Sequence, residues 1–160
     1  MIDAIIKIKH ILIGKKLTIS VAESLTSGLL QANIARISGA SNFFKGGVTT
    51  YSIEAKVNLL GVDNVEANRC NAVSPIIAEQ MAIGACKLFK SDIGIGTTGY
   101  AEPNNAQDIN YPFAFIAVYI NSSNSNETYS LKVEGYELGR NEMREYVTEQ
   151  ALSLLIEKLK

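Results

Sequence analysis

Short apolar runs rich in β-branched residues alternate with helical patterns along most of this chain. Residues 17–22, 43–51 and 92–97 predict three strands, because β-branched side chains pack well on a pleated surface. Segments with helical caps or periodicity separate these runs, and strands joined through helices usually lie parallel to each other. The alternation predicts an α/β fold, a three-layer α/β/α sandwich around a mixed, largely parallel sheet.

The remaining segments supply the helices and an antiparallel hairpin. Ser74-Pro75 predicts the start of a long helix that reaches about Lys90, because Ser is a good N-cap and proline suits the first turn. The opening helix is expected to end at Gly14, where a C-cap glycine belongs. Residues 113–120 and 128–133 predict a hairpin around the loop 121–126. Further helices are expected over residues 29–37, 52–61 and 147–159.

Length and charge limit the classes of function. The 160 residues suit a single domain, 1–160, and 15 Lys+Arg against 16 Asp+Glu leave a formal charge of −1. Binders of nucleic acid or acidic membranes need a basic stripe, which this balance argues against. No apolar run reaches the roughly 18 residues that span a bilayer, and charges interrupt the N-terminal segment where a secretion signal would be apolar. We therefore expect a cytoplasmic domain with neither a nucleic-acid nor a membrane partner.

Residues typical of metal sites and of histidine-based triads are scarce. Cys70, Cys86 and His10 lie far apart in sequence, and a structural zinc site needs about four ligands at short spacings, so no metal site is expected. His10 precedes the first predicted strand, which makes it a poor base for a Ser-His-Asp triad. A nucleophilic hydroxyl would need another base, and a lysine with a lowered pKa can serve.

Gly94-Ile95-Gly96-Thr97-Thr98-Gly99 matches the GxGxxG pattern of dinucleotide-binding proteins. That pattern normally closes a first strand and opens a helix whose N-terminus meets the pyrophosphate. Here the first two glycines fall inside a predicted strand, and a loop with Pro103 follows. We expect them to serve packing, although a dinucleotide-dependent oxidoreductase is the alternative.

Polar clusters follow three of the predicted strands. They are residues 22–28, residues 49–52 with Lys56 one turn later, and residues 97–99. Ligands of open α/β sheets bind beyond the carboxyl ends of strands, so the clusters are expected to converge on one pocket. The alternative is ordinary turn and cap chemistry, since Ser and Thr are common N-caps.

A series of motifs runs through nearly the whole chain. They are Ala22-Glu23-Ser24-x-Thr26-x-Gly28, Gly39-Ala40-Ser41, Gly46-Gly47-Val48-x-x-Tyr51-Ser52-x-x-Ala55-Lys56, Leu60-Gly61-Val62, Ala72-Val73-Ser74, Met81-Ala82-x-Gly84-Ala85 and Thr98-Gly99-x-Ala101-x-Pro103. In this order they resemble the CinA C-terminal domain family, which contains nicotinamide mononucleotide amidohydrolases. The resemblance implies a three-layer α/β domain that hydrolyses the carboxamide of nicotinamide mononucleotide, giving nicotinic acid mononucleotide and ammonia without metal or cofactor. It also suggests a homodimer.

The resemblance further implies which residues act. Family active sites use serines, a tyrosine, a lysine and an arginine, which match Ser24, Ser41, Tyr51, Lys56 and Arg140. We expect Ser41 to be the nucleophile and Lys56 its general base, whereas Ser24 either relays the proton or is itself the nucleophile.

Other residues are expected to bind the substrate. Tyr51 and Thr98 are candidate hydrogen-bond donors to the ring or the amide, and Gly99 is a further candidate for binding the substrate. The predicted helix start at Thr26-Ser27-Gly28 and Arg140 are candidate groups for the 5′-phosphate.

The chain departs from the family pattern at several former glycines. The family has glycine at the positions of Ser27, Glu102 and Ala114 in this chain. It also has a pair of glycines after the proline, where this chain has Asn104-Asn105-Ala106 after Pro103. Losing glycines and adding a carboxylate would narrow the pocket or repel a phosphate. The alternative to an amidohydrolase is therefore a catalytically weak or inactive nucleotide-binding protein on the same fold.

Overall fold

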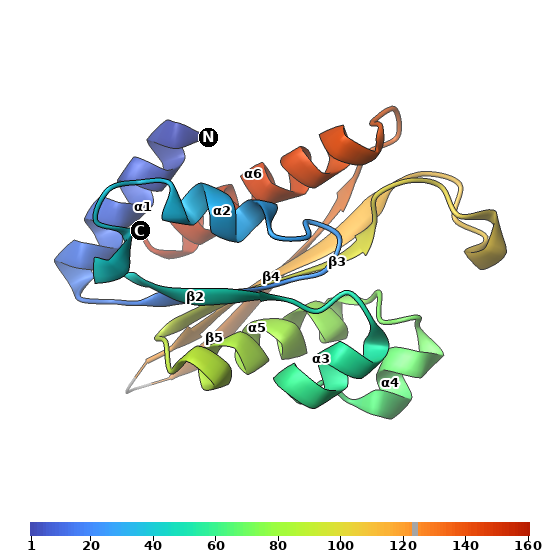
Figure 1. Ribbon diagram of the computed structural model, residues 1–160, viewed down its shortest axis with the longest axis horizontal. Helices are drawn as coiled ribbons and strands as arrows, with labels where there is room; N and C mark the ends of the chain where they lie inside the picture. The colour runs from blue at the N-terminus through green and yellow to red at the C-terminus, as the bar shows by residue number, and fades with distance from the viewer. Residues whose placement is uncertain (123–124) are drawn as a thin grey trace.

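A five-stranded sheet forms the centre of the computed structural model, which describes residues 1–122 and 125–160 (Figure 1). The strands are β1 (Ile19–Glu23), β2 (Phe44–Thr49), β3 (Ile93–Tyr100), β4 (Phe113–Asn121) and β5 (Asn126–Glu134). They lie in the order β2-β1-β3-β4-β5. β1 is parallel to both of its neighbours, whereas β4 is antiparallel to both of its own. The sheet is therefore mixed.

Helices cover both faces of the sheet (Figure 1). One face carries α1 (Ile2–Lys15), α2 (Leu29–Ala35) and α6 (Arg140–Lys158). The other carries α3 (Ile53–Leu60), α4 (Asn64–Arg69) and α5 (Pro75–Phe89). Two short 3₁₀ turns, Ala40–Asn42 and Asn105–Gln107, complete the described elements. The predicted three-layer α/β/α architecture is confirmed.

Every residue of β1 is buried, because β1 has strands on both sides and helices on both faces. On α1, the residues Ile5, Ile8 and Leu12 recur at helical spacing and are fully buried in the larger apolar cluster. Each such side chain contributes about 1.5–3 kcal/mol through its burial. A smaller cluster, which includes Ile77 and Met81 of α5, fills the layer on the opposite face.

The boundaries of several elements differ from those expected. α1 continues through Gly14 and ends where Lys16 adopts a left-handed conformation (φ 55°). The sequence pattern does not predict α4, although its N-cap is local: Asp63 caps the helix by accepting a hydrogen bond from the Glu66 N–H at 2.7 Å. β3 extends to Tyr100, beyond the predicted end at residue 97. The predicted hairpin is present, and residues 123–124 of its loop lie outside the described residues.

Gly94 and Gly96 lie inside β3, directly against α5. A Cβ atom at Gly94 would overlap the carbonyl oxygen of Ala82, and one at Gly96 would overlap that of Ala78. The two glycines therefore let the α5 backbone approach the strand closely, as expected. The GxGxxG pattern here reflects helix–sheet packing.

The order of the strands creates a site at one edge of the sheet. The chain leaves β1 through α2 on one face to reach β2, and returns from β2 through helices on the other face to reach β3. Crevices form where connections diverge in this way, beyond the carboxyl ends of the strands. Within the described residues, no helix is both long and apolar enough to cross a bilayer.

Candidate active site

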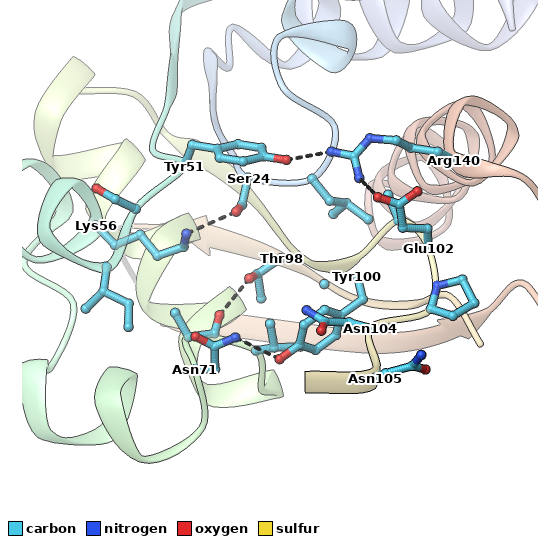
Figure 2. A pocket seen from close by; sticks show the side chains of 18 residues that line it. Ser24, Tyr51, Lys56, Asn71, Thr98, Tyr100, Glu102, Asn104, Asn105 and Arg140 are labelled. Atoms are coloured by element: carbon cyan, nitrogen blue, oxygen red, sulfur yellow. Dashed lines mark hydrogen bonds and ion pairs between the residues drawn. The ribbon is translucent and has the colours of Figure 1, made fainter. Parts of the chain in front are cut away.

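A pocket of about 630 Å³ lies beyond the carboxyl ends of β1, β2 and β3 (Figure 2). Its volume is in the range of small-molecule sites. Its walls come from the end of β3, the loops after these three strands, the first turn of α3, the segment between α4 and α5, and the start of α6. They comprise Ser24, Leu25, Tyr51, Ser52, Ile53, Lys56, Asn71, Ala72, Val73, Thr98, Gly99, Tyr100, Ala101, Glu102, Pro103, Asn104, Asn105 and Arg140.

Lys56 and Ser24 form a hydrogen-bonded pair at the base of the pocket (Figure 2). Lys56 lies in the first turn of α3, which Ser52 caps by accepting a hydrogen bond from the Ala55 N–H at 3.1 Å. Its Nζ reaches back to donate to the Thr50 carbonyl at 2.8 Å and to Ser24 Oγ at 3.0 Å. The ammonium is thus held between the ends of β1 and β2.

Burial changes the acidity of Lys56. The side chain is only 2% exposed, and this desolvation lowers the pKa of Lys56 from 10.5 to about 8. About a tenth of the molecules therefore carry a neutral amine at pH 7. A neutral lysine beside a serine hydroxyl can act as a general base.

Successive residues at the end of β1 point to opposite faces of the sheet. Glu23 faces α2, whereas Ser24 faces α3 and its lysine. The Ser24 N–H donates to the Thr97 carbonyl at 3.0 Å, which ties the serine to the neighbouring strand. The backbone therefore holds the Ser24 hydroxyl in place.

Three side chains from different elements meet at the mouth of the pocket. Arg140, the first residue of α6, donates from Nη2 to the Tyr51 hydroxyl at 2.8 Å and from Nη1 to Glu102 Oε1 at 2.6 Å (Figure 2). Tyr51 and then Glu102 raise the pKa of Arg140, so the guanidinium stays charged. This chain of contacts joins the loops after β2 and β3 to α6.

The opposite wall contains Thr98, which the sequence predicts as a site residue, and also Asn71, Ala72 and Tyr100, which it does not. Thr98 donates its hydroxyl proton to the Ala72 carbonyl at 2.7 Å, and Asn71 Nδ2 donates to the Tyr100 hydroxyl at 2.9 Å. Thr98 therefore lines the pocket and contacts the α4–α5 segment, and its expected role as a donor to the substrate stays a prediction. Asn71 and Ala72 both have positive φ, at 51° and 55°. Asparagine is enriched in this conformation, whereas alanine is not, so the residue type of Ala72 gives no signal for it.

Ser41, the expected nucleophile, does not line this pocket. It lies in the exposed 3₁₀ turn before β2, whereas Tyr51 and Lys56 follow the end of that strand. The six residues of β2 span about 20 Å. Ser41 is therefore at the opposite edge of the sheet from the Lys56 amine. Of the two serines considered, Ser24 is the one that contacts Lys56.

At the expected phosphate site, Thr26, Ser27 and Gly28, the side chain of Glu23 takes the place that a phosphate would have. The buried Glu23 carboxylate accepts hydrogen bonds from the N–H groups of Gly28 (3.0 Å), Leu30 (3.0 Å) and Gln31 (2.8 Å). It satisfies the free N–H groups at the start of α2 that a phosphate would need.

The side chains of this segment confirm that it lies outside the pocket. The Thr26 hydroxyl is buried against that of Thr97 at 2.8 Å, and Ser27 is exposed. Neither they nor Gly28 lines the pocket wall. Of the groups expected to bind the phosphate, Arg140 is the one that lines the pocket.

The departures from the family pattern fall in two groups. Ser27 accommodates its left-handed conformation (φ 48°) on the surface, and Ala114 is fully buried in β4 opposite Gly99, so neither contacts the pocket. Glu102 and the pair Asn104-Asn105 line the pocket. The change with chemical consequence is therefore the carboxylate of Glu102.

Metal ligation finds no support in residues 1–122 and 125–160. No group of three or more His, Cys, Asp or Glu side chains lies close enough there to hold an ion. The polar groups that converge on the pocket are hydroxyls, amides, an amine, a guanidinium and a single carboxylate, which suit an organic ligand.

Comparison with known proteins gives consistent matches. A family model described as "CinA C-terminal domain" matches residues 3–159. A competence-damage inducible protein of Halothermothrix orenii is 38% identical over 155 residues, which cover 96% of this chain and 37% of that protein. One from Streptococcus equi is 47% identical over 116 residues, which cover 72% of this chain and 26% of that protein. The chain spans about a quarter to a third of the length of the first curated relatives it matches.

Solved structures agree over nearly the full length of the chain. The competence/damage inducible protein CihA of Agrobacterium tumefaciens superposes with a TM-score of 0.86 at 27% identity, covering 98% of this chain and 93% of that one. The competence damage-inducible protein A of Klebsiella pneumoniae gives a TM-score of 0.85 at 27% identity, covering 99% and 96%. The chain belongs to the CinA C-terminal domain family.

Proposed function

We propose that this domain hydrolyses the carboxamide of a pyridine nucleotide, with nicotinamide mononucleotide as the substrate to test. The observation that carries the proposal is the contact between the buried, pKa-lowered Lys56 amine and the Ser24 hydroxyl at the base of the pocket. A serine attacks an amide only when a base removes its proton, and Lys56 lies at hydrogen-bond distance from that proton.

The first step would acylate Ser24. Neutral Lys56 accepts the Ser24 proton while Oγ attacks the carboxamide carbon, forming a tetrahedral intermediate. The protonated lysine then gives this proton to the amide nitrogen, the C–N bond breaks, and ammonia leaves. The Thr50 carbonyl, which accepts from Nζ at 2.8 Å, keeps the amine pointed at Ser24 throughout.

The second step would release the acid. A water molecule loses its proton to the neutral Lys56 amine and attacks the ester carbon. The ester bond to Ser24 breaks, the lysine returns the proton to Oγ, and the carboxylic acid leaves. One residue thus serves as base and acid in both halves of the reaction.

The direct test is an ammonia-release assay on nicotinamide mononucleotide with the purified protein. We expect ammonia and nicotinic acid mononucleotide in equal amounts, and we expect the rate to persist in excess EDTA because the serine and lysine supply the nucleophile and the base. Saturable binding of the nucleotide without ammonia release would instead support the nucleotide-binding alternative. Loss of activity in EDTA would contradict the mechanism.

The rate should rise with pH. The active form of Lys56 is the neutral amine, and its pKa is about 8, so kcat/KM is expected to increase about tenfold per pH unit well below pH 8. It should level off above pH 8, where the amine is already deprotonated. A pH profile of kcat/KM between pH 5.5 and 9.5 measures this midpoint. A profile that falls across this range would show that the protonated lysine is the required form.

A further inference from the structure

The ion pair at the pocket mouth joins two exposed side chains. Glu102, on the loop after β3, and Arg140, at the start of α6, have side chains that are 56% and 48% exposed. Exposed ion pairs contribute little to the stability of a fold. Glu102 can therefore be replaced without unfolding the protein, and we expect the replacement to change ligand binding in the pocket that Glu102 lines.

Both terminal nitrogens of Arg140 are already engaged. Nη1 contacts Glu102 Oε1 at 2.6 Å, and Nη2 donates to the Tyr51 hydroxyl at 2.8 Å (Figure 2). A guanidinium binds a phosphate most strongly through two parallel N–H groups. A phosphorylated ligand that approaches the Nη1–Nη2 edge of Arg140 must compete with the Glu102 carboxylate for Nη1.

The charge of Glu102, like its contact with Arg140, disfavours a phosphate at the pocket mouth. Three charged side chains line the pocket: Lys56, Glu102 and Arg140. Lys56 is buried at the base, so at the mouth the carboxylate of Glu102 cancels the charge of Arg140. A phosphate placed there meets a competing carboxylate at short range, whereas a pyridinium nucleoside without phosphate does not.

We propose that Glu102 is a specificity-determining residue that occupies the anion-binding edge of Arg140 and shifts the pocket from phosphorylated towards unphosphorylated pyridine nucleosides. This inference rests on the proposed function for the identity of the ligands. It assigns Arg140 as the phosphate contact and Glu102 as the group that competes for it.

The test compares two ligands that differ by the phosphate, nicotinamide mononucleotide and nicotinamide riboside. Their dissociation constants are measured by calorimetry on Ser24→Ala, which prevents turnover, with and without Glu102→Gln. Glu102→Gln removes the charge and keeps the size of the side chain. We expect it to tighten binding of the nucleotide about tenfold, as expected for removing a like charge near the phosphate and releasing its arginine. Binding of the riboside should be unchanged or weaker.

Two controls separate this effect from a general change in charge. Glu137→Gln removes the same charge from an exposed residue three positions before Arg140, and Glu137 has no ion-pair partner in the described part of the chain. It should change the nucleotide-to-riboside ratio less than twofold. In an Arg140→Ala background, Glu102→Gln should lose most of its effect, because the arginine that it releases is absent.

The possible outcomes are distinct. An unchanged or lowered preference for the nucleotide in Glu102→Gln overturns the inference, and so does a failure of both proteins to bind either ligand. Absence of ammonia release by the wild-type chain overturns the proposed reaction alone, because the ratio of dissociation constants needs no turnover. In active enzyme, the same substitution should lower KM for the nucleotide with little change in kcat.

Discussion

Replacing Ser24 with alanine is expected to lower kcat for deamidation of nicotinamide mononucleotide by about a thousandfold or more, with substrate binding little changed. The substitution removes the attacking oxygen, which acts in the chemical step and not in holding the substrate. Ser24 Oγ is the hydroxyl that lies 3.0 Å from Lys56 Nζ. Steady-state kinetics of ammonia release and calorimetric binding measure the two quantities separately.

Replacing Lys56 with alanine should lower kcat by a similar factor. Replacing it with arginine tests whether the reaction needs a base or only a positive charge. Lys56→Arg keeps a positive charge but cannot be deprotonated at working pH, so it should not restore activity. Recovery of most of the activity by Lys56→Arg would mean that the positive charge, and not the base, is what the reaction needs.

Ser41→Ala provides the matched control for Ser24→Ala. The two substitutions remove the same atom from serines at opposite edges of the sheet. Ser41→Ala is expected to keep kcat within about twofold, because Ser41 is remote from the lysine. If Ser41→Ala were inactive and Ser24→Ala active, the nucleophile would be the residue before β2 and the pocket chemistry described here would be wrong.

Gly96→Ala is expected to destabilise the fold by about 3 kcal/mol or more, lowering Tm by about 10 °C. The added Cβ would overlap the Ala78 carbonyl oxygen, which belongs to the α5 backbone and cannot rotate away as a side chain can. Relief requires α5 to move off β3, and α5 also packs against β1 and β4. Thermal unfolding followed by circular dichroism measures the change.

Gly14→Ala is the control for Gly96→Ala. Gly14 lies inside α1, and a Cβ there meets no atom within 4 Å, so alanine should stabilise the protein by about 0.5–1 kcal/mol through its better helix propensity. The packing interpretation would be wrong if Gly96→Ala kept the native Tm and lost binding of a dinucleotide. The GxGxxG pattern would then be a nucleotide-binding site.

Much of the fold is encoded locally and could be predicted. The β-branched runs, the Ser74-Pro75 helix start and the glycine after α3 act within a few residues, and the corresponding elements are present. Boundaries such as the end of α1 depended on more than a residue type, since Lys16 adopts there the conformation expected of glycine. Short helices such as α4 carry too weak a periodicity to stand out.

The sequence by itself determined that polar residues follow the strands, and therefore that Ser24, Tyr51, Lys56 and Thr98 would gather at one edge of the sheet. The tertiary structure alone decided which serine meets the lysine, because Ser24 and Ser41 are both serines in family motifs and differ in which end of a strand they occupy. It also decided that Glu23, whose side chain points to the opposite face from Ser24, accepts hydrogen bonds from the N–H groups at the start of α2. Contacts of this kind join residues through the pairing of strands and the burial of a charge, and neither is visible in the local pattern of the chain.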